Sequence, residues 1–159
     1  MPEVVNAVIE IPKGSKNKYE YDPEMGAIRL DRVLHSAVFY PADYGFIPRT
    51  LSDDGDPLDI LVLITESTFP GCVMKARPVG VLNMTDDKGI DEKIIAVAVG
   101  DPKLREIEDI SDLDEHTVKE IANFFEIYKQ LENKMVRVDG WMGKEDAHKV
   151  IQEAVARYR

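Results

Sequence analysis

Residues 53–64 read DDGDPLDILVLI, so an acidic stretch runs directly into an apolar one. The apolar half predicts a buried strand over residues 58–64. Asp54 and Asp56 share one face of an extended chain, because they lie two residues apart. The glycine and proline between the acids supply a bend that would bring Asp59 beside them. Three carboxylates held together repel one another unless a cation lies among them.

Two interpretations of this acidic loop stay open on its residues alone. Carboxylates on a rigid loop are hard oxygen ligands, which suit Mg²⁺ or Mn²⁺. The same residues would also form a solvated turn whose aspartate side chains cap backbone amides. An EF-hand is excluded, because a calcium loop starting at Asp54 needs an acid or amide at Leu58 and glycine at Asp59. In haloacid-dehalogenase-type phosphatases the buried strand precedes the acidic pair, which excludes that class too.

The length, net charge and cysteine count of the chain argue against several classes of protein. The chain has 159 residues, which suits one domain spanning residues 1–159, and its formal net charge is −10. Nucleic-acid and anionic-membrane partners need clustered Lys and Arg, so neither is expected. No apolar run approaches the ~20 residues of a membrane span, and the N-terminus shows no signal-peptide pattern. Cys72 is the only cysteine, which excludes an internal disulfide and favours a cytoplasmic protein.

Short strands follow one another over the first two thirds of the chain. We expect strands over residues 4–11, 18–22, 27–34, 58–64, 73–84 and 91–99. The second and third form a hairpin, because the DPEMG between them is turn chemistry. Pro78 to Gly80 is expected to interrupt the long strand. Residues 37–50 contain two prolines and a glycine, which favours an irregular, aromatic-rich loop.

The last third of the chain changes to a helical period. Apolar residues recur at helical spacing over 114–132 and over 144–158, which predicts two amphipathic helices with a short strand over 135–138 between them. Many short strands followed by two helices favour a mainly β (α+β) fold. A small closed barrel with two flanking C-terminal helices fits this pattern, and an OB-type barrel is one such fold. Another α+β arrangement would produce a similar pattern.

Further charged residues extend the acidic loop into a candidate site. Asp86 precedes a turn, while Asp91 and Lys93 follow it and share a face of the next strand. Two acid-bearing turns, each beside a buried strand, would meet at one mouth of a barrel. Taken alone, the second turn is an ordinary polar hairpin.

Cationic and aromatic residues complete the candidate set. Lys18 lies beside Glu20 on one strand face. Arg32 is expected on the same strand face as the apolar residues Ile28 and Leu30, which would point it inward. An inward Arg needs an anionic partner. Tyr44 has a hydroxyl that would bind phosphate, although packing explains it as well. Lys129 is read most simply as an exposed helix lysine.

Eight different blocks of residues, taken in their order along the chain, carry a family resemblance. They are VIEIP (8–12), KYE (18–20), LDR (30–32), FYPADYGFIP (39–48), DGDPLD (54–59), RPVGVLNMTD (77–86), DEK (91–93) and FFEIYKQLE (124–132). Together they resemble the soluble family I inorganic pyrophosphatases of the prokaryotic type. The resemblance implies a five-stranded OB-type barrel with helices packed outside. It also implies Mg²⁺-dependent hydrolysis of pyrophosphate (diphosphate) to two orthophosphates.

The resemblance further implies roles for individual residues. The implied metal ligands are Glu10, Glu20, Asp54, Asp59, Asp86 and Asp91. The implied substrate ligands are Lys18, Arg32, Tyr44, Lys93, Tyr128 and Lys129. Asp56 is implied as the general base, with Asp91 as its rival, and Tyr40 would support the site at its edge.

Metal ions are the implied cofactors, with several Mg²⁺ ions per site and Mn²⁺ or Zn²⁺ as substitutes. Without metal, the seven acids and four bases of this set leave about −3, which repels pyrophosphate. Three divalent ions would bring the site to about +3. The site therefore predicts metal binding before, or together with, substrate. The resemblance also implies a homohexamer.

Two rival functions stay open. A non-enzymatic OB-fold module would bind single-stranded nucleic acid through a basic groove and stacking aromatics, but the net charge of −10 argues against it. Another metal-dependent phosphohydrolase would act on nucleotides or polyphosphate. The sequence holds no GxxxxGK[ST] motif to support a P-loop version of that rival, and substrate profiling separates the remaining cases.

Overall fold

The computed structural model describes residues 2–159, which form eight strands and two α-helices. The strands are β1 (Val5–Ile11), β2 (Asn17–Asp22), β3 (Ala27–Val33), β4 (Asp43–Ile47), β5 (Leu58–Leu63), β6 (Val73–Asp86), β7 (Gly89–Ala98) and β8 (Arg137–Gly143). The helices are α1 (Glu115–Ile127) and α2 (Lys144–Tyr158), with 3-10 turns η1 (Pro102–Leu104), η2 (Ile110–Asp112) and η3 (Gln130–Glu132). Within these residues, no helix combines the length and apolar character needed to cross a bilayer.

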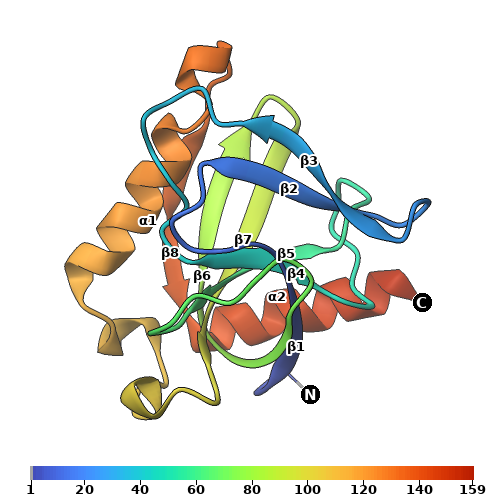
Figure 1. Ribbon diagram of the computed structural model, residues 1–159. Coiled ribbons are helices and arrows are strands. Elements are labelled where there is room, and N and C mark those ends of the chain that lie inside the picture. Colours follow the sequence, from blue (N-terminus) through green and yellow to red (C-terminus); the bar gives the residue numbers. More distant parts are fainter. Residues whose placement is uncertain (1) are drawn as a thin grey trace.

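Five strands close into a ring in the order β1, β4, β5, β7, β6, and β6 pairs back to β1. Every pair in the ring is antiparallel except β5 with β7. β8 extends the sheet beyond β6, while β2 and β3 form a separate hairpin on the side of the barrel away from α2 (Figure 1). The ring and its two C-terminal helices confirm the predicted mainly β closed barrel.

The prediction of an irregular loop over residues 37–50 is wrong, because β4 (Asp43–Ile47) lies inside that range. β4 pairs with β1 and β5 and is therefore part of the ring. A Cβ placed on Gly45 would lie 1.8 Å from the carbonyl oxygen of Val8. Glycine is needed there because the two backbones approach closely. The residue that suggested a loop is thus a requirement of the strand pairing.

β6 is the longest strand, and it pairs with β1, β7 and β8. The predicted interruption is present as a register shift between Pro78 and Gly80, where proline has no N–H for the ladder. The strand predicted over 135–138 is shifted along the chain and lies at Arg137–Gly143. Its pairing with β6 continues through Trp141 and Met142, which extends it past the predicted end.

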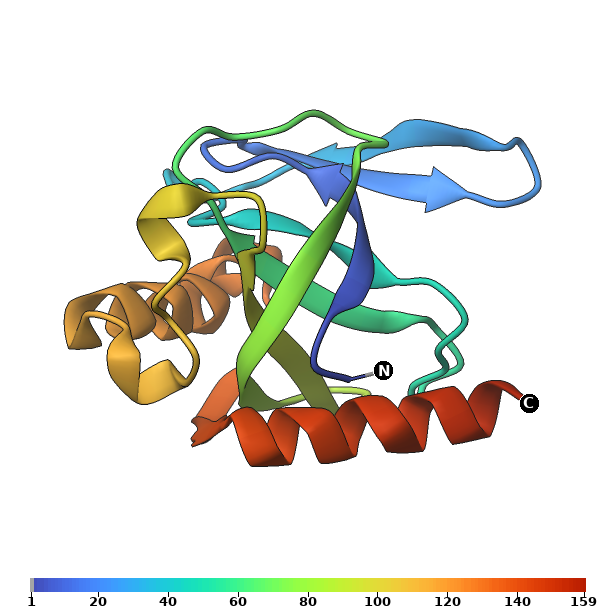
Figure 2. The ribbon, with the colours of Figure 1, turned by 90° about the horizontal axis from the view of Figure 1, so that it is seen from below.

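Two clusters of buried side chains fill the molecule. The aromatic cluster lies against α1, and its aromatic members are Tyr40, Tyr44, Phe124, Phe125 and Tyr128. The aliphatic cluster lies against α2, and its buried members are all Ala, Ile, Leu or Val, including Ala147, Ile151 and Ala154 from the helix. Figure 2 shows the two helices on different sides of the barrel. Each helix therefore covers its own cluster.

The predicted helix over 114–132 is too long. α1 ends at Ile127, Tyr128 forms its C-cap, and η3 follows. Asn133 then turns the chain with a left-handed φ of 59°. Leu131 continued the helical spacing in the sequence, but it is an exposed side chain in the turn. The early end of α1 matters because it directs the following residues toward the barrel.

Candidate active site

A buried lysine lies at the centre of the candidate site. The side chain of Lys93 is 3% exposed, and its Nζ donates to Tyr44 Oη at 2.7 Å. The same Nζ lies 2.9 Å from Asp59 Oδ2 and 3.1 Å from Asp91 Oδ2. The parallel pairing of β5 with β7 sets this arrangement, because it places Asp59 directly opposite Lys93. Burial alone would lower the pKa of Lys93, but Asp59 and the other groups around it raise that pKa well above its ordinary value.

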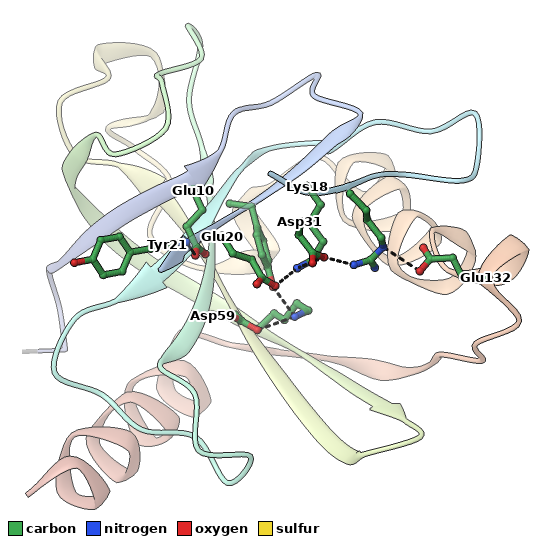
Figure 3. Close-up of polar contacts among 10 residues, drawn as sticks. Glu10, Lys18, Glu20, Tyr21, Asp31, Asp59 and Glu132 are labelled. Atoms are coloured by element: carbon green, nitrogen blue, oxygen red, sulfur yellow. Dashed lines mark hydrogen bonds and ion pairs between the residues drawn. The ribbon is translucent and has the colours of Figure 1, made fainter. Parts of the chain in front are cut away.

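Burial and the neighbouring Asp59 raise the pKa values of two further acids of the site, Glu10 and Asp91. Burial raises the pKa of Glu10 on β1 to about 7, against the hydrogen bond that the Tyr21 amide donates to it at 2.8 Å, and Asp59 adds to the rise. Burial also raises the pKa of Asp91, with Lys93 opposing and Asp59 adding to the rise. Figure 3 shows Glu10 beside Tyr21. These carboxylates therefore destabilise one another's charge.

The acidic loop before β5 forms the capping turn that one interpretation of the sequence predicts, while metal binding by this loop stays a prediction. Asp54 Oδ1 accepts a hydrogen bond from the Asp56 amide at 3.0 Å, so this side chain caps a turn. Gly55 carries the turn with a φ of 89°. Burial raises the pKa of Asp56, and Asp54 and Asp59 raise it further. The bend thus brings the three aspartates close enough to interact, as the glycine and proline predicted.

Tyr128 and Lys129 approach the site from the end of α1. Burial raises the pKa of Tyr128 to about 12, with the Lys93 charge opposing it. Burial and then Lys93 lower the pKa of Lys129, while Asp86 opposes them. Asp86 lies at the β6–β7 turn, where it accepts a hydrogen bond from the Lys88 amide at 2.8 Å. Lys129 is half-buried in the turn after α1, so it is not the exposed helix lysine of the simpler interpretation, and its role as a substrate ligand stays a prediction.

A row of ion pairs joins β2, β3 and η3 along the edge of the site (Figure 3). Lys18 Nζ lies 2.5 Å from Glu20 Oε1 and 3.7 Å from Asp31 Oδ2. Arg32 donates to Asp31 through Nη1, and its Nε lies 2.9 Å from Glu132 Oε1. Burial alone would lower the pKa of Arg32, but Glu132 and then Asp31 raise it above its ordinary value. The anionic partner that an inward Arg32 requires is thus present.

Three residues that touch the predicted set have no role in the sequence interpretation. Asp31 lies where the β2–β3 register shifts, so simple alternation does not reveal which way it faces. The Phe125 ring centre lies 5.2 Å from Lys93 Nζ, a cation–π contact that helical spacing alone reads as packing. Glu132 has the appearance of an ordinary charge near a helix end. The one feature of the sequence that could have drawn attention to Glu132 is its place in the FFEIYKQLE block.

The donor chemistry of the site fits a hard divalent cation. Across residues 2–159, no three acidic, histidine or cysteine side chains lie close enough together to surround one ion. Asp59 and Asp91 are both bonded to the ammonium group of Lys93. Carboxylate oxygens are nevertheless the donors that favour Mg²⁺, and a cation among them would relieve their repulsion.

The chain is similar to known proteins over nearly its whole length. A family model described as inorganic pyrophosphatase matches residues 7–159. The inorganic pyrophosphatase of Geobacillus stearothermophilus is 54% identical, over 98% of this chain and 94% of the relative. The crystal structure of inorganic pyrophosphatase from Thermus thermophilus is 54% identical and covers 99% of this chain and 92% of its own, with a TM-score of 0.97. A type I inorganic pyrophosphatase from Toxoplasma gondii is 26% identical, covers 98% and 79%, and has a TM-score of 0.83.

Proposed function

This chain belongs to the inorganic pyrophosphatase family, and on that premise we propose that it hydrolyses pyrophosphate to two orthophosphates with Mg²⁺ as its cofactor. The observation that carries the proposal is the buried Lys93 ammonium, which is bonded to Tyr44, Asp59 and Asp91 inside a ring of further charged groups. Pyrophosphate is a compact polyanion, so its hydrolysis needs positive charge at the oxygens and an activated water.

The acids of the site would hold the metal ions. Bound Mg²⁺ supplies positive charge for the phosphate oxygens and lowers the pKa of water. Asp54, Asp59 and Asp91 would bind the tightest ion, and Asp59 would reach a second. Asp86 and Asp91 would bind an ion that arrives with the substrate. The remaining two acids, Glu10 and Glu20, would bind partly through water.

Asp56 would act as the general base, taking the proton of the attacking water onto a carboxylate oxygen. Burial and two neighbouring aspartates raise its pKa, which moves a carboxylate toward the range useful for proton transfer near neutral pH. Asp91 is the rival for this role, because burial raises its pKa as well.

The cationic and phenolic groups would bind the substrate oxygens. They come from β2, β3, β4, β7 and the turn after α1, and are Lys18, Arg32, Tyr44, Lys93, Tyr128 and Lys129. Arg32 has the planar fork that matches two phosphate oxygens at once. Lys93 would act as a compact charge whose position is fixed by its two carboxylate partners.

The state of the protein in the cell follows from the same family resemblance. We expect a homohexamer in the cytoplasm, where a single cysteine has no need of a disulfide partner. Sedimentation of the purified protein measures the assembly directly. A monomer at micromolar concentration would contradict the expected hexamer without bearing on the reaction.

Phosphate release by the purified protein tests the proposed reaction. Pyrophosphate is offered with Mg²⁺, with EDTA in place of Mg²⁺, and in parallel with ATP or tripolyphosphate as the substrate. We expect fast release from pyrophosphate that EDTA abolishes, and little release from the other two. Faster release from ATP or tripolyphosphate would assign the site to another class of phosphohydrolase. No release with any divalent ion would overturn the proposal.

A further inference from the structure

Glu132 is a buried acid at the edge of the site with no role in the proposed reaction. Its side chain is 8% exposed, and its Oε1 lies 2.9 Å from Arg32 Nε. The other carboxylate oxygen, Oε2, is buried without a hydrogen-bond partner within residues 2–159, and Arg32 Nε also lacks hydrogen-bond geometry. Buried polar atoms without partners are rare and need an explanation. The pair is thus close enough to attract but is not locked in one geometry.

The backbone fixes where Glu132 lies. Its amide donates to the Lys129 carbonyl at 3.0 Å, and the Lys134 amide donates to the same carbonyl at 3.3 Å. Asn133 closes the turn with a left-handed φ of 59°. Glu132 is therefore tied to the end of α1, three residues after Lys129 and four after Tyr128. Through its carboxylate, this end of α1 reaches across to Arg32 on β3.

Arg32 has a second acid beside it that competes for the same charge. Its Nη1 donates to Asp31, the preceding residue. With Asp31 as the only partner, the terminal nitrogens would stay turned toward the protein's own carboxylate. A partner on the Nε edge holds the guanidinium from its other side, which leaves the terminal nitrogens free to exchange Asp31 for a phosphate oxygen.

We propose that Glu132 is a positioning residue, which holds Arg32 by its Nε edge so that the terminal nitrogens of the guanidinium bind pyrophosphate. This inference rests on the proposed function, in which Arg32 is a substrate ligand. The row of ion pairs from Glu20 to Glu132 in Figure 3 then orients Lys18 and Arg32, the two cations of the row that would bind the substrate.

A second effect of Glu132 has the opposite sign, which makes the inference testable. An acid beside Arg32 also lowers the positive potential that attracts pyrophosphate. If the charge of Glu132 were its only influence, removing it would tighten substrate binding and lower KM. If Glu132 positions Arg32, removing it weakens binding and raises KM.

Steady-state kinetics of Glu132→Ala and Glu132→Gln decide between the two. We expect Glu132→Ala to raise KM about 10-fold with kcat changed less than 3-fold, because the guanidinium loses the ion pair that orients it. Glu132→Gln keeps an acceptor for Nε and should recover most of that loss. Glu126→Gln removes an exposed acid from α1 and should change neither constant. An unchanged or lower KM in Glu132→Ala would overturn the inference.

A double-mutant cycle separates positioning from a merely structural role. Lysine has no Nε–H group at the guanidinium position, so in an Arg32→Lys background Glu132→Ala should add less than a 2-fold rise in KM. Equal effects of Glu132→Ala in both backgrounds, with a lowered Tm, would mean that Glu132 only stabilises the turn.

Binding of inorganic phosphate with Mg²⁺, measured by titration calorimetry, gives a readout that does not need turnover. Glu132→Ala should weaken phosphate binding, and Glu132→Gln should restore most of it. A parent protein that binds phosphate but releases none from pyrophosphate would refute the proposed function while still testing the positioning. An active parent whose phosphate binding does not respond to Glu132→Ala would refute the positioning alone.

Discussion

The aromatic cluster under α1 and the aliphatic cluster under α2 differ in chemistry although the same barrel strands supply both. Tyr44 and Tyr128 bring hydroxyl groups into the first cluster, and the Lys93 ammonium lies 5.1 Å from the Tyr44 ring centre. The buried members of the aliphatic cluster carry no polar side-chain atoms. The two clusters take alternate residues of β5 and β7, so they lie on opposite faces of the sheet. The comparison teaches that one face of the barrel strands lies beside charged groups while the other stabilises the fold by burial alone.

The two helices divide in the same way. α1 ends early, and the residues just after it, Tyr128, Lys129 and Glu132, all reach the site or its edge. α2 contributes Ala147, Ile151 and Ala154 to packing. If this division holds, changes on the α1 side should alter catalysis with little loss of stability. Changes on the α2 side should do the reverse.

The largest effect is expected from Asp56→Asn, on the charged side. Removing the proposed base should lower kcat by ~10²- to 10⁴-fold, the usual contribution of general acid–base catalysis, while Mg²⁺ binding largely survives. Stopped-flow phosphate release and calorimetric Mg²⁺ titration measure the two quantities. Asp53→Asn changes a neighbouring exposed acid and serves as the matched control. Full turnover in Asp56→Asn would transfer the role of base to Asp91.

Ile151→Ala, on the aliphatic side, should have the opposite effect: it should lower stability and leave kcat almost unchanged. Ile151 is 3% exposed in the aliphatic cluster, and truncating such a side chain costs about 2–5 kcal/mol of unfolding free energy. Urea unfolding measures the loss, and kcat per folded molecule should stay within 2-fold of the parent. Val155→Ala, at a partly buried position on the same helix, should lose less. A fall in kcat without a fall in stability would break the division between the two sides.

Glu10→Gln should change the pH dependence of stability in metal-free protein. The pKa of Glu10 is about 7 in the folded protein, against an ordinary 4.5, so the folded state binds the proton more tightly. This group therefore lowers the free energy of unfolding progressively as pH rises from about 4.5 to about 7. In EDTA, we expect Glu10→Gln to match the parent below about pH 4.5 and to exceed it by about 3 kcal/mol at pH 8.

Unfolding curves at the two pH values measure this difference directly. A difference between Glu10→Gln and the parent that does not change with pH would contradict the raised pKa. Saturating Mg²⁺ at pH 8 should reverse the order, because an ion would stabilise the parent's ionised Glu10 and not the amide.

The smallest effect is expected from Tyr44→Phe. It removes the hydroxyl that accepts from Lys93 at 2.7 Å, and a lost hydrogen bond to a charged group costs about 1.5 kcal/mol or more. We expect the free energy of unfolding to fall by about 1.5 kcal/mol, less than for Ile151→Ala, and KM to rise about 10-fold, because Tyr44 is also a proposed substrate ligand. Tyr158→Phe removes an exposed hydroxyl from α2 and should leave both unchanged. Equal behaviour of the two variants would mean that the Tyr44 hydroxyl has no part in the site.

The sequence predicted much of the barrel and the residue types of the site, because strand alternation and acid-bearing turns are local patterns. The parallel pairing of β5 with β7, which puts Asp59 opposite Lys93, joins distant segments and leaves no local signal. β4 was hidden because Gly45 reads as a loop residue until the closeness of Val8 is known. The sequence did not predict a role for Glu132, because that role depends on its ion pair with Arg32, 100 positions earlier in the chain.

The ammonium group of Lys93 acts as a counter-ion that the chain carries within itself. The single ammonium group bonds to both carboxylates and offsets part of their repulsion without an external ion, so the barrel should fold and keep its shape in a chelator. The catalyst could then be made and stored in an inactive form and switched on by adding Mg²⁺. An enzyme with that property is a practical reagent for coupled assays in which pyrophosphate must persist until a chosen moment.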